Sequence, residues 1–530
     1  MKKLTVVLCI LLLFACNNGG GGSSGNKPIV ISNLPPSVKQ VTFRGNHATM
    51  QLDNLANNDI VVARVNVSDF DVSTANTGSI NGIQSYSTGA SATAESKRPV
   101  RKHHSPISLP FKPSQERRAT IKAAPTLGST EYFWVLESIG LEVYKSIPAV
   151  LRAIGNHCYV WVATDNDGGS GDDQISVAQA ASYQQMFDKL YALETNLFGY
   201  EMGGGSSGNG GLDGDKRISI LILDIDFDHD YGIDSTLGYF SPVDEYTQAQ
   251  LDNEGEPYKS NEREIFYIDA FYASTESELT YTTLAHEFQH MIHFAQHAKH
   301  SDDSKCSELW FNEMFSAIAE DLCAHPSIGL SYDDLIEYGG YPYYFNSYFG
   351  RVSYSTWDSP IYGNWEEDWP YAKAYMLGAY LARNYGGARL LHEISTNGYD
   401  NEDALGAALY KLYPAQFTTD YRRNASIAFA RFGEALVYGN GSIPQGVHTL
   451  NKTTVSSLNG NTYYFPALNL WDYEQEVIST KGPAIPNNWN NSDIKAFGIV
   501  ANRSRNVSGS HTLTFTRPKD PNILTFVIIK

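Results

Sequence analysis

The strongest constraint on this chain is an apolar run at helical spacing that carries two histidines. The run is LAHEFQHMI at residues 284–292, which places His286 and His290 four positions apart. Residues four apart on a helix lie about one turn apart on the same face, so both imidazoles can reach one metal ion. The same pattern arises on ordinary helices whose two histidines face solvent, and a second signal is needed to separate the two interpretations.

A second helical pattern supplies that signal. It is WFNEMFSAIAE at residues 310–320, and its Glu313 lies 23 positions after His290. The aromatic and apolar residues on both sides of Glu313 should hold this helix against the core. A carboxylate in such surroundings costs free energy unless it is paired or bound to a metal. We therefore predict that His286, His290 and Glu313 hold one ion.

The ligand set indicates which metal and which chemistry to expect. Two imidazoles and a carboxylate suit zinc and leave a fourth position open for water. Glu287 directly follows the first ligand and is predicted to act on that water as a general base. His293 lies roughly 10 Å along the helix axis from His286, too far to share the ion. Glu320 follows Glu313 by two turns and either orients a ligand histidine or is an ordinary solvated carboxylate.

The two motifs together, H-E-x-x-H and then W-x-N-E, resemble the gluzincin clan of metallopeptidases. Within that clan, HEFQHM at residues 286–291 resembles the hyicolysin family. The similarity covers about residues 132–385 and is specific at the two helices. It implies a thermolysin-like catalytic domain, zinc on His286, His290 and Glu313, and hydrolysis of peptide bonds. The expected fold class is α+β, with a mainly helical C-terminal half, flanked by small β modules.

The aminopeptidase branch of the clan suggests how the reaction is completed. It places a tyrosine near the oxyanion, downstream of the glutamate ligand, and Tyr371 in YAKA loosely resembles that segment. The other candidates are Tyr338, Tyr341, Tyr362 and His325. That branch also carries G-x-M-E-N before its zinc helix, which residues 260–283 lack, and this favours an endopeptidase. The strand at 264–269 is expected at a sheet edge, where an extended substrate could pair with it.

Two other classes of function remain open. The protein could be a surface adhesin or binding module with a structural or vestigial zinc site, or a hydrolase of something other than peptides. A structural zinc site usually fills its fourth position with protein. The presence of Glu287 beside three ligands therefore favours catalysis.

The first residues have the pattern of an export signal. Lys2 and Lys3 precede an apolar run at 4–14 that is too short to remain as a membrane span. The run leads to Cys16, and a flexible Gly/Ser-rich tether follows directly. This resembles a bacterial lipoprotein signal and implies that Cys16 is lipidated, the alternative being an ordinary cleaved signal. We expect a secreted protein held by this lipid at the bacterial cell envelope, outward-facing or periplasmic.

Composition and periodicity divide the chain into five parts. They are a lipoprotein signal at 1–16, a tether and N-terminal β module at 17–72, a linker at 73–125, the metallopeptidase domain at 126–440, and a C-terminal β-sandwich module at 441–530. Within the catalytic part, the periodicity predicts a helix at 177–198, a strand at 218–223, and helices at 371–384 and 427–436.

The net charge and several minor motifs limit the kinds of partner that we expect. Lys and Arg number 39 and Asp and Glu 58, so the formal charge is −19, and no nucleic acid is expected to bind. The expected partner is a protein or peptide substrate, and no feature of the sequence specifies an oligomeric state. The acidic clusters at 165–173 and 224–230 either hold calcium or form ordinary polar turns. Cys306 and Cys323 bracket the third ligand and either form a disulfide or stay as buried thiols.

Overall fold

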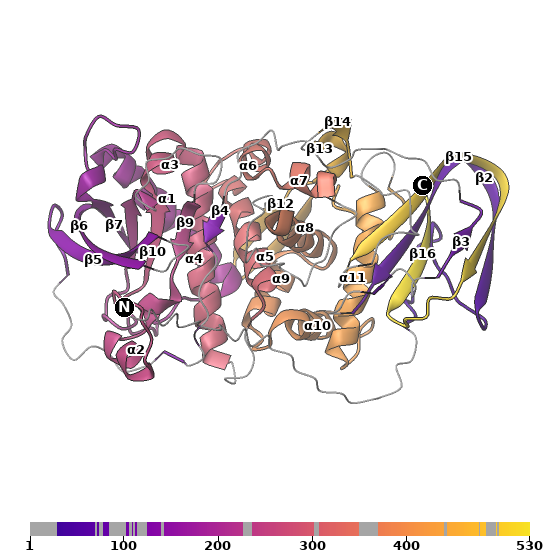
Figure 1. The fold of residues 1–530 in the computed structure, drawn as a ribbon, viewed down its shortest axis with the longest axis horizontal. Helices are drawn as coiled ribbons and strands as arrows, with labels where there is room; N and C mark the ends of the chain where they lie inside the picture. Colours follow the sequence, from indigo (N-terminus) through magenta and orange to yellow (C-terminus); the bar gives the residue numbers. More distant parts are fainter. Residues whose placement is uncertain are drawn as a thin grey trace, which may run out of the picture.

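The computed structural model describes residues 29–68, 72–73, 78–83, 102–104, 109, 112–113, 124–138, 143–225, 236–300, 307–348, 369–438, 443–475, 478–483, 494 and 498–530. This part of the chain is elongated, with a seven-stranded sheet at one end, helices in the middle and a five-stranded sheet at the other end (Figure 1). In it, no helix is both long and apolar enough to cross a membrane.

The seven-stranded sheet mixes parallel and antiparallel neighbours. In spatial order its strands are β4 (Lys102–His104), β9 (Thr236–Phe240), β10 (Ile265–Asp269), β8 (Ile218–Leu223), β7 (Cys158–Ala163), β6 (Val143–Ile154) and β5 (Thr130–Ser138). β7, β8 and β10 run parallel, whereas β9 is antiparallel to β10. Because parallel neighbours need a long crossover, α1 (Val177–Phe198) connects β7 to β8.

The two faces of this sheet bury different cores. In β7, Val160 and Val162 face the core shared with the helices, while Trp161 between them faces a second core on the opposite side. Helices α1 and α4 (Ser277–His300) cover the first face. There the rings of Phe187 and Phe288 meet with centroids 4.9 Å apart. Helix α4, which contains His286 and His290, is thus packed directly on the sheet.

Helices make up most of the middle of the molecule. They are α5 (Leu309–Ala319), α6 (Tyr332–Gly339), α7 (Tyr341–Tyr348), α8 (Trp369–Asn384), α9 (Ala388–Thr396), α10 (Asn401–Leu412) and α11 (Tyr421–Val437). Two short helices, α2 (Gln248–Glu254) and α3 (Ala270–Thr275), lie at the end of the molecule that carries the seven-stranded sheet (Figure 1). α5 packs between α4 and α8. The helices predicted at 371–384 and 427–436 lie in α8 and α11, and the mixture of helices and sheets confirms the α+β prediction.

The five-stranded sheet joins the two ends of the described chain (Figure 1). Its order is β1 (Val38–Gln40), β16 (Ile523–Ile529), β2 (His47–Asn66), β15 (Ile499–Thr516) and β3 (Ile80–Asn81). β2 pairs antiparallel with both β15 and β16. The sheet packs on α11, where the Ser426 hydroxyl donates to the Val67 carbonyl at 3.3 Å.

This pairing corrects the predicted organisation of two separate β modules at 17–72 and 441–530. Alternating residues predict that a strand exists, but they do not specify a partner more than 400 positions away. The rest of the C-terminal region also departs from a sandwich, because it forms the small pairs β11 (Thr454–Leu458) with β12 (Asn461–Phe465) and β13 (Glu474–Gln475) with β14 (Ile478–Lys481). Tyr463 of β12 donates its hydroxyl to the Leu193 carbonyl of α1 at 2.9 Å, so this pair packs on the catalytic region.

The strand at 264–269 was expected at a sheet edge, and this prediction is wrong. β10 lies inside the sheet between β8 and β9, and its five residues are all buried. The run IFYID has no polar alternation, which is typical of a strand covered on both faces.

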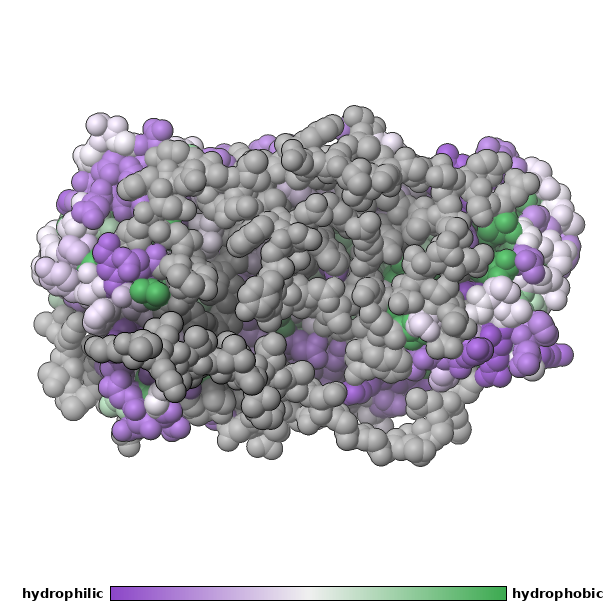
Figure 2. Space-filling view, in the orientation of Figure 1, coloured by the Kyte–Doolittle hydropathy of each residue, from purple (hydrophilic) through white to green (hydrophobic). Residues whose placement is uncertain are grey.

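Some sequence predictions fall on residues that the structure does not describe. Cys16, the tether, Cys306 and most of the 73–125 linker lie outside the described residues. Cys323 is a free, buried thiol whose sulfur lies 3.5 Å from the Tyr281 carbonyl oxygen. On the face shown in Figure 2, hydrophilic residues are exposed at both ends of the molecule, with a few hydrophobic residues among them.

Candidate metal centre

Two helices position the three predicted ligands. His286 and His290 lie one turn apart on α4, which is anchored by Leu284, Phe288 and Met291 in the main core. Glu313 lies on α5, whose aromatic residues hold it in the same core. All three ligand side chains are fully buried. The alternative of two surface histidines is therefore excluded.

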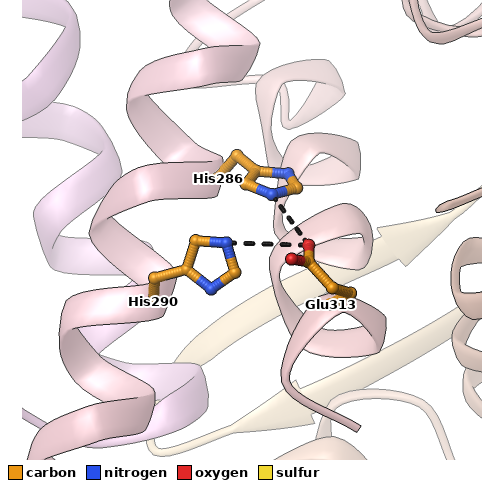
Figure 3. A group of neighbouring side chains, drawn as sticks. All are labelled: His286, His290 and Glu313. Carbon is orange, nitrogen blue, oxygen red and sulfur yellow. Dashed lines mark hydrogen bonds and ion pairs between the residues drawn. The ribbon is translucent and has the colours of Figure 1, made fainter. Parts of the chain in front are cut away.

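The three side chains converge on one point. Both imidazoles turn toward the Glu313 carboxylate across the gap between the helices (Figure 3). His286 Nε2 lies 3.2 Å and His290 Nε2 3.6 Å from Glu313 Oε2. One ligand atom from each residue lies within 4.8 Å of the other two, close enough for all three to bind one metal ion. In the described part of the chain this group contains three residues. A zinc ion with four ligands would therefore keep one coordination position for a water molecule.

A buried carboxylate orients the first histidine. Glu320 Oε1 lies 2.8 Å from His286 Nδ1, the ring nitrogen that faces away from Glu313. The Tyr341 hydroxyl donates to the same Glu320 oxygen at 2.6 Å. Of the two alternatives for Glu320, the structure supports the orienting role, because its carboxylate is buried and bonded to a candidate ligand.

Neutral groups orient the second histidine. Asn312 Oδ1 lies 3.0 Å and Ser316 Oγ 2.9 Å from His290 Nδ1. Both side chains come from α5, the helix that carries Glu313. The sequence alone did not indicate a role for either residue. Asn312 precedes Glu313 by one residue and Ser316 follows it by three. The two are therefore four positions apart on the helix, and this spacing could have indicated them.

The protonation of the two rings differs. Burial lowers the pKa of His290, which favours the neutral imidazole that a metal requires. Burial acts in the same direction on His286, but its hydrogen bonds to Glu313 and Glu320 outweigh it and raise the pKa to about 10. In the metal-free protein His286 therefore carries a proton. An ion that binds here must displace that proton, so binding should strengthen as pH rises.

Glu287 is buried beside the ligands and lies against strand β9. A Cβ atom at Gly238 of β9 would lie 3.2 Å from Glu287 Cγ and 2.8 Å from the Tyr267 carbonyl oxygen, so only glycine permits this approach. Burial is the main cause that raises the pKa of Glu287, to about 7, with the neighbouring histidines acting in the opposite direction. A carboxylate with a pKa near neutrality suits a general base.

Tyr371 is placed beside the centre by the start of α8. Its ring centroid lies 6.4 Å from that of His286, and the side chain is mostly buried. Two rival candidates are engaged elsewhere: the Tyr341 hydroxyl bonds Glu320, and His325 Nε2 lies 2.9 Å from the Thr462 carbonyl oxygen. His293 bonds Ser307 at 2.9 Å and is no part of the ligand group. Tyr362 lies outside the described residues.

Protein contacts account for the first of the two acidic loops considered for calcium. Asp167 pairs with the Arg152 guanidinium, and Asp173 Oδ2 accepts from Asn166 Nδ2 at 3.0 Å. In the second loop, the backbone N–H of Asp224 donates to Asn166 Oδ1 at 3.1 Å. Asp226, Asp228 and Asp230 lie outside the described residues. The first loop therefore matches the polar-turn alternative.

The residues present fit a bound zinc ion. His290 Nε2 is fully buried and has no hydrogen-bond partner, although it lies 3.6 Å from a carboxylate oxygen. Buried polar atoms are normally satisfied. A metal ion between the imidazoles and Glu313 would satisfy this nitrogen and replace the proton on His286.

Comparison with known proteins points in the same direction. No family model matches the chain. It is 26% identical over 321 residues to a neutral metalloprotease, ShpI, from Staphylococcus hyicus, which covers 58% of this chain and 64% of that protein. The chain thus spans less than two thirds of the length of this relative.

The ligand assignment predicts that Glu313→Gln loses tightly bound zinc. The substitution removes the anionic ligand while keeping the size of the side chain, and we expect zinc affinity to fall by about a hundredfold or more. Zinc per chain is measured by mass spectrometry after dialysis.

Glu308→Gln is the matched control for this experiment, because Glu308 precedes the same helix and bonds Trp310 Nε1, not a histidine. It should retain full zinc. One tightly bound zinc in Glu313→Gln would show instead that Glu320 or Asp321 is the third ligand.

Proposed function

We propose that this protein is a zinc metallopeptidase of the gluzincin clan, in its hyicolysin family, and that it cleaves within polypeptide chains. The observation that carries the proposal is the buried convergence of His286, His290 and Glu313 with Glu287 adjacent on the same helix. Support comes from the similarity to a protein described as a neutral metalloprotease. The thermolysin-like assignment of the catalytic region belongs to the same proposal.

The chain supplies ligands, a base and a donor for this chemistry. His286, His290 and Glu313 would hold the zinc ion. When bound, zinc supplies Lewis-acid activation of a water and of the peptide carbonyl. Glu287 accepts the proton of the attacking water and passes it to the leaving amine. The hydroxyl of Tyr371 donates a hydrogen bond to the carbonyl oxygen as negative charge develops there.

The surrounding contacts keep these groups in place without adding a fourth ligand. Glu320 and Tyr341 fix the ring of His286, and Asn312 and Ser316 fix the ring of His290. Such outer contacts strengthen ligand binding and set ring orientation. An exposed or loosely held imidazole ring would lose rotamer entropy when it binds the ion. The rings of His286 and His290 have already lost this entropy on folding, so binding of the ion does not cost it again.

Specificity for internal peptide bonds rests on what precedes the metal helix. Residues 260–283 contain no G-x-M-E-N segment that could capture a free substrate amine. In the structure these residues form buried β10, then α3, then the start of α4. The proposal of an endopeptidase therefore predicts cleavage of casein and of peptides blocked at both ends.

Glu287→Gln separates binding of the metal from catalysis. It should retain stoichiometric zinc, because Glu287 is not a ligand, and lose at least about a hundredfold in kcat on casein, because the base is removed. Glu278→Gln, on the same helix, should retain activity. Zinc content and kcat are measured on the same preparations, and near-normal turnover in Glu287→Gln removes this residue from the mechanism.

The same assignment predicts the acid limb of the pH profile. The base must be deprotonated to act, and burial raises its pKa to about 7 in the metal-free protein. A nearby cation lowers the pKa of a carboxyl group. We therefore expect kcat/KM to fall as pH decreases through a midpoint at or below about 7, and this limb to be absent from the residual activity of Glu287→Gln.

Tyr371→Phe tests the oxyanion donor by removing one oxygen. Loss of such a donor typically lowers kcat by about a hundredfold or more, and zinc content should not change. Tyr375→Phe is the matched control on the same helix, because its hydroxyl bonds Asp321 at 2.9 Å. Equal kcat values for Tyr371→Phe and the unmodified protein would assign Tyr371 to packing alone.

The location of the protein is a further part of the proposal. If Cys16 carries the lipid, Cys16→Ala should move the protein from the membrane fraction to the soluble fraction, measured by immunoblotting after ultracentrifugation. The apolar run at 4–14 is too short to anchor the chain in its place. Persistent membrane association of Cys16→Ala would contradict a lipid anchor.

A further inference from the structure

The strand that lies beside the candidate general base is covered by a short segment from earlier in the chain. This segment is β4, the outermost strand of the seven-stranded sheet, and it pairs with β9 (Figure 1). The pairing is parallel and joins Lys102 to Thr236, His103 to Gly238 and His104 to Tyr239. None of the roles assigned to the metal centre or to catalysis uses β4.

β9 is the strand that lies against the base. A Cβ atom at Gly238 would lie 2.9 Å from Thr283 Cγ2 and 3.2 Å from Glu287 Cγ, so the backbone of β9 passes directly beside these two side chains of α4. On its inner side β9 pairs antiparallel with β10. The outer edge, where β4 lies, is therefore the edge of β9 at which another extended chain could pair.

A peptide that reached the base through this strand would need the place that β4 occupies. Extended peptides bind a strand edge through main-chain N–H and C=O groups. Neighbouring strands lie about 4.7–4.9 Å apart. A peptide on the outer edge of β9 would therefore lie one strand spacing from the residue that approaches Glu287. The hydrogen-bonding groups along one edge point to a single neighbouring strand, so β4 and a peptide cannot pair there together.

The pairing of β4 with β9 is short and irregular. β4 has three residues, and its register shifts between Lys102 and His103. Parallel pairing is also slightly less stable per residue than antiparallel pairing. Few hydrogen bonds must therefore break when β4 leaves the edge of β9.

The chain that follows β4 stays attached to the catalytic region by other contacts. Leu109 packs against the apolar cluster that contains Val243 and Leu251. Gln250 Nε2 donates to the Lys112 carbonyl at 2.6 Å. These contacts do not depend on the pairing with β9, so β4 can leave the edge while the chain after it remains in place.

We propose that β4 is an internal competitor of the substrate, which occupies the outer edge of β9 until an extended polypeptide displaces it. This inference rests on the proposed peptidase function, because it names the surface that receives the peptide. A competitor joined to the same chain acts at an effective concentration of roughly millimolar. Polypeptides that bind the edge weakly are thus kept from Glu287, and unfolded chains that pair along the whole strand are admitted.

The competition is tested by measuring how tightly the full chain binds an unfolded polypeptide. Zinc-loaded protein carrying Glu287→Gln, to prevent cleavage, is titrated against fluorescein-labelled casein, and the Kd is measured by fluorescence anisotropy. His103→Pro in that background removes a backbone N–H from β4 and disfavours its pairing. We expect the Kd to fall by about tenfold or more. His103→Ala keeps the backbone N–H and is the matched control, so its Kd should equal that of the parent.

A reversible lock tests the same inference without breaking the strand. Lys102 and Thr236 are paired across β4 and β9, and neighbouring strands lie at a separation that a disulfide can span. Lys102→Cys combined with Thr236→Cys should bind casein at least about tenfold more weakly when oxidised than after reduction. Each single cysteine variant is the control, and its Kd should not depend on oxidation. Zinc content and Tm are measured on every variant to confirm that it is folded.

Three outcomes overturn the proposal: an equal Kd for His103→Pro and the parent, an equal Kd for the oxidised and reduced double cysteine variant, or no casein binding by any folded variant. Failure of the proposed function has a different signature. In that case the zinc-loaded protein with Glu287 intact cleaves no casein, whereas the binding differences, which are measured without catalysis, are still observed.

Discussion

A carboxylate buried between two imidazole rings is the interaction on which the centre of this molecule depends. Glu313 is fully buried and lies 3.2 Å and 3.6 Å from the Nε2 atoms of His286 and His290. Removing one charged partner from such a group leaves the others buried and uncompensated, which is strongly destabilising. Helices α4 and α5 must therefore keep one relative position, and the sheet beneath α4 fixes where that position lies.

The polar contacts around this group form a second layer on the same elements. Glu320 extends from the turn that follows α5, whereas Asn312 and Ser316 lie on α5 itself. The helix that supplies the third ligand orients His290, and the turn directly after that helix orients His286. A small rotation of α5 would disturb all of these contacts together, so the arrangement is either formed as a whole or lost as a whole.

The sequence predicts the parts of the fold that depend on local periodicity. The helix at 177–198 and the strand at 218–223 are found with the predicted bounds, and the two ligand helices are found where the motifs indicate. The candidate ligands could be predicted for the same reason, because helical spacing shows which residues lie on the same face of a helix. The sequence does not specify which distant strands pair, and this is why β2 and β15 were assigned to different modules.

The pairing of β2 with β15 and β16 also governs what a cut in the chain would do. β2 lies before the segment at 84–101, and the catalytic helices lie after it, but β2 is hydrogen-bonded along its length to the last two strands. Cleavage between these parts would break a covalent bond without separating the fragments, because the sheet holds them as a noncovalent complex. If the N-terminal fragment is anchored through its tether, the fragment with the catalytic helices would stay attached to the same anchor. Release would then require opening the five-stranded sheet, so it would be governed by the unfolding of that sheet and not by the protease that made the cut.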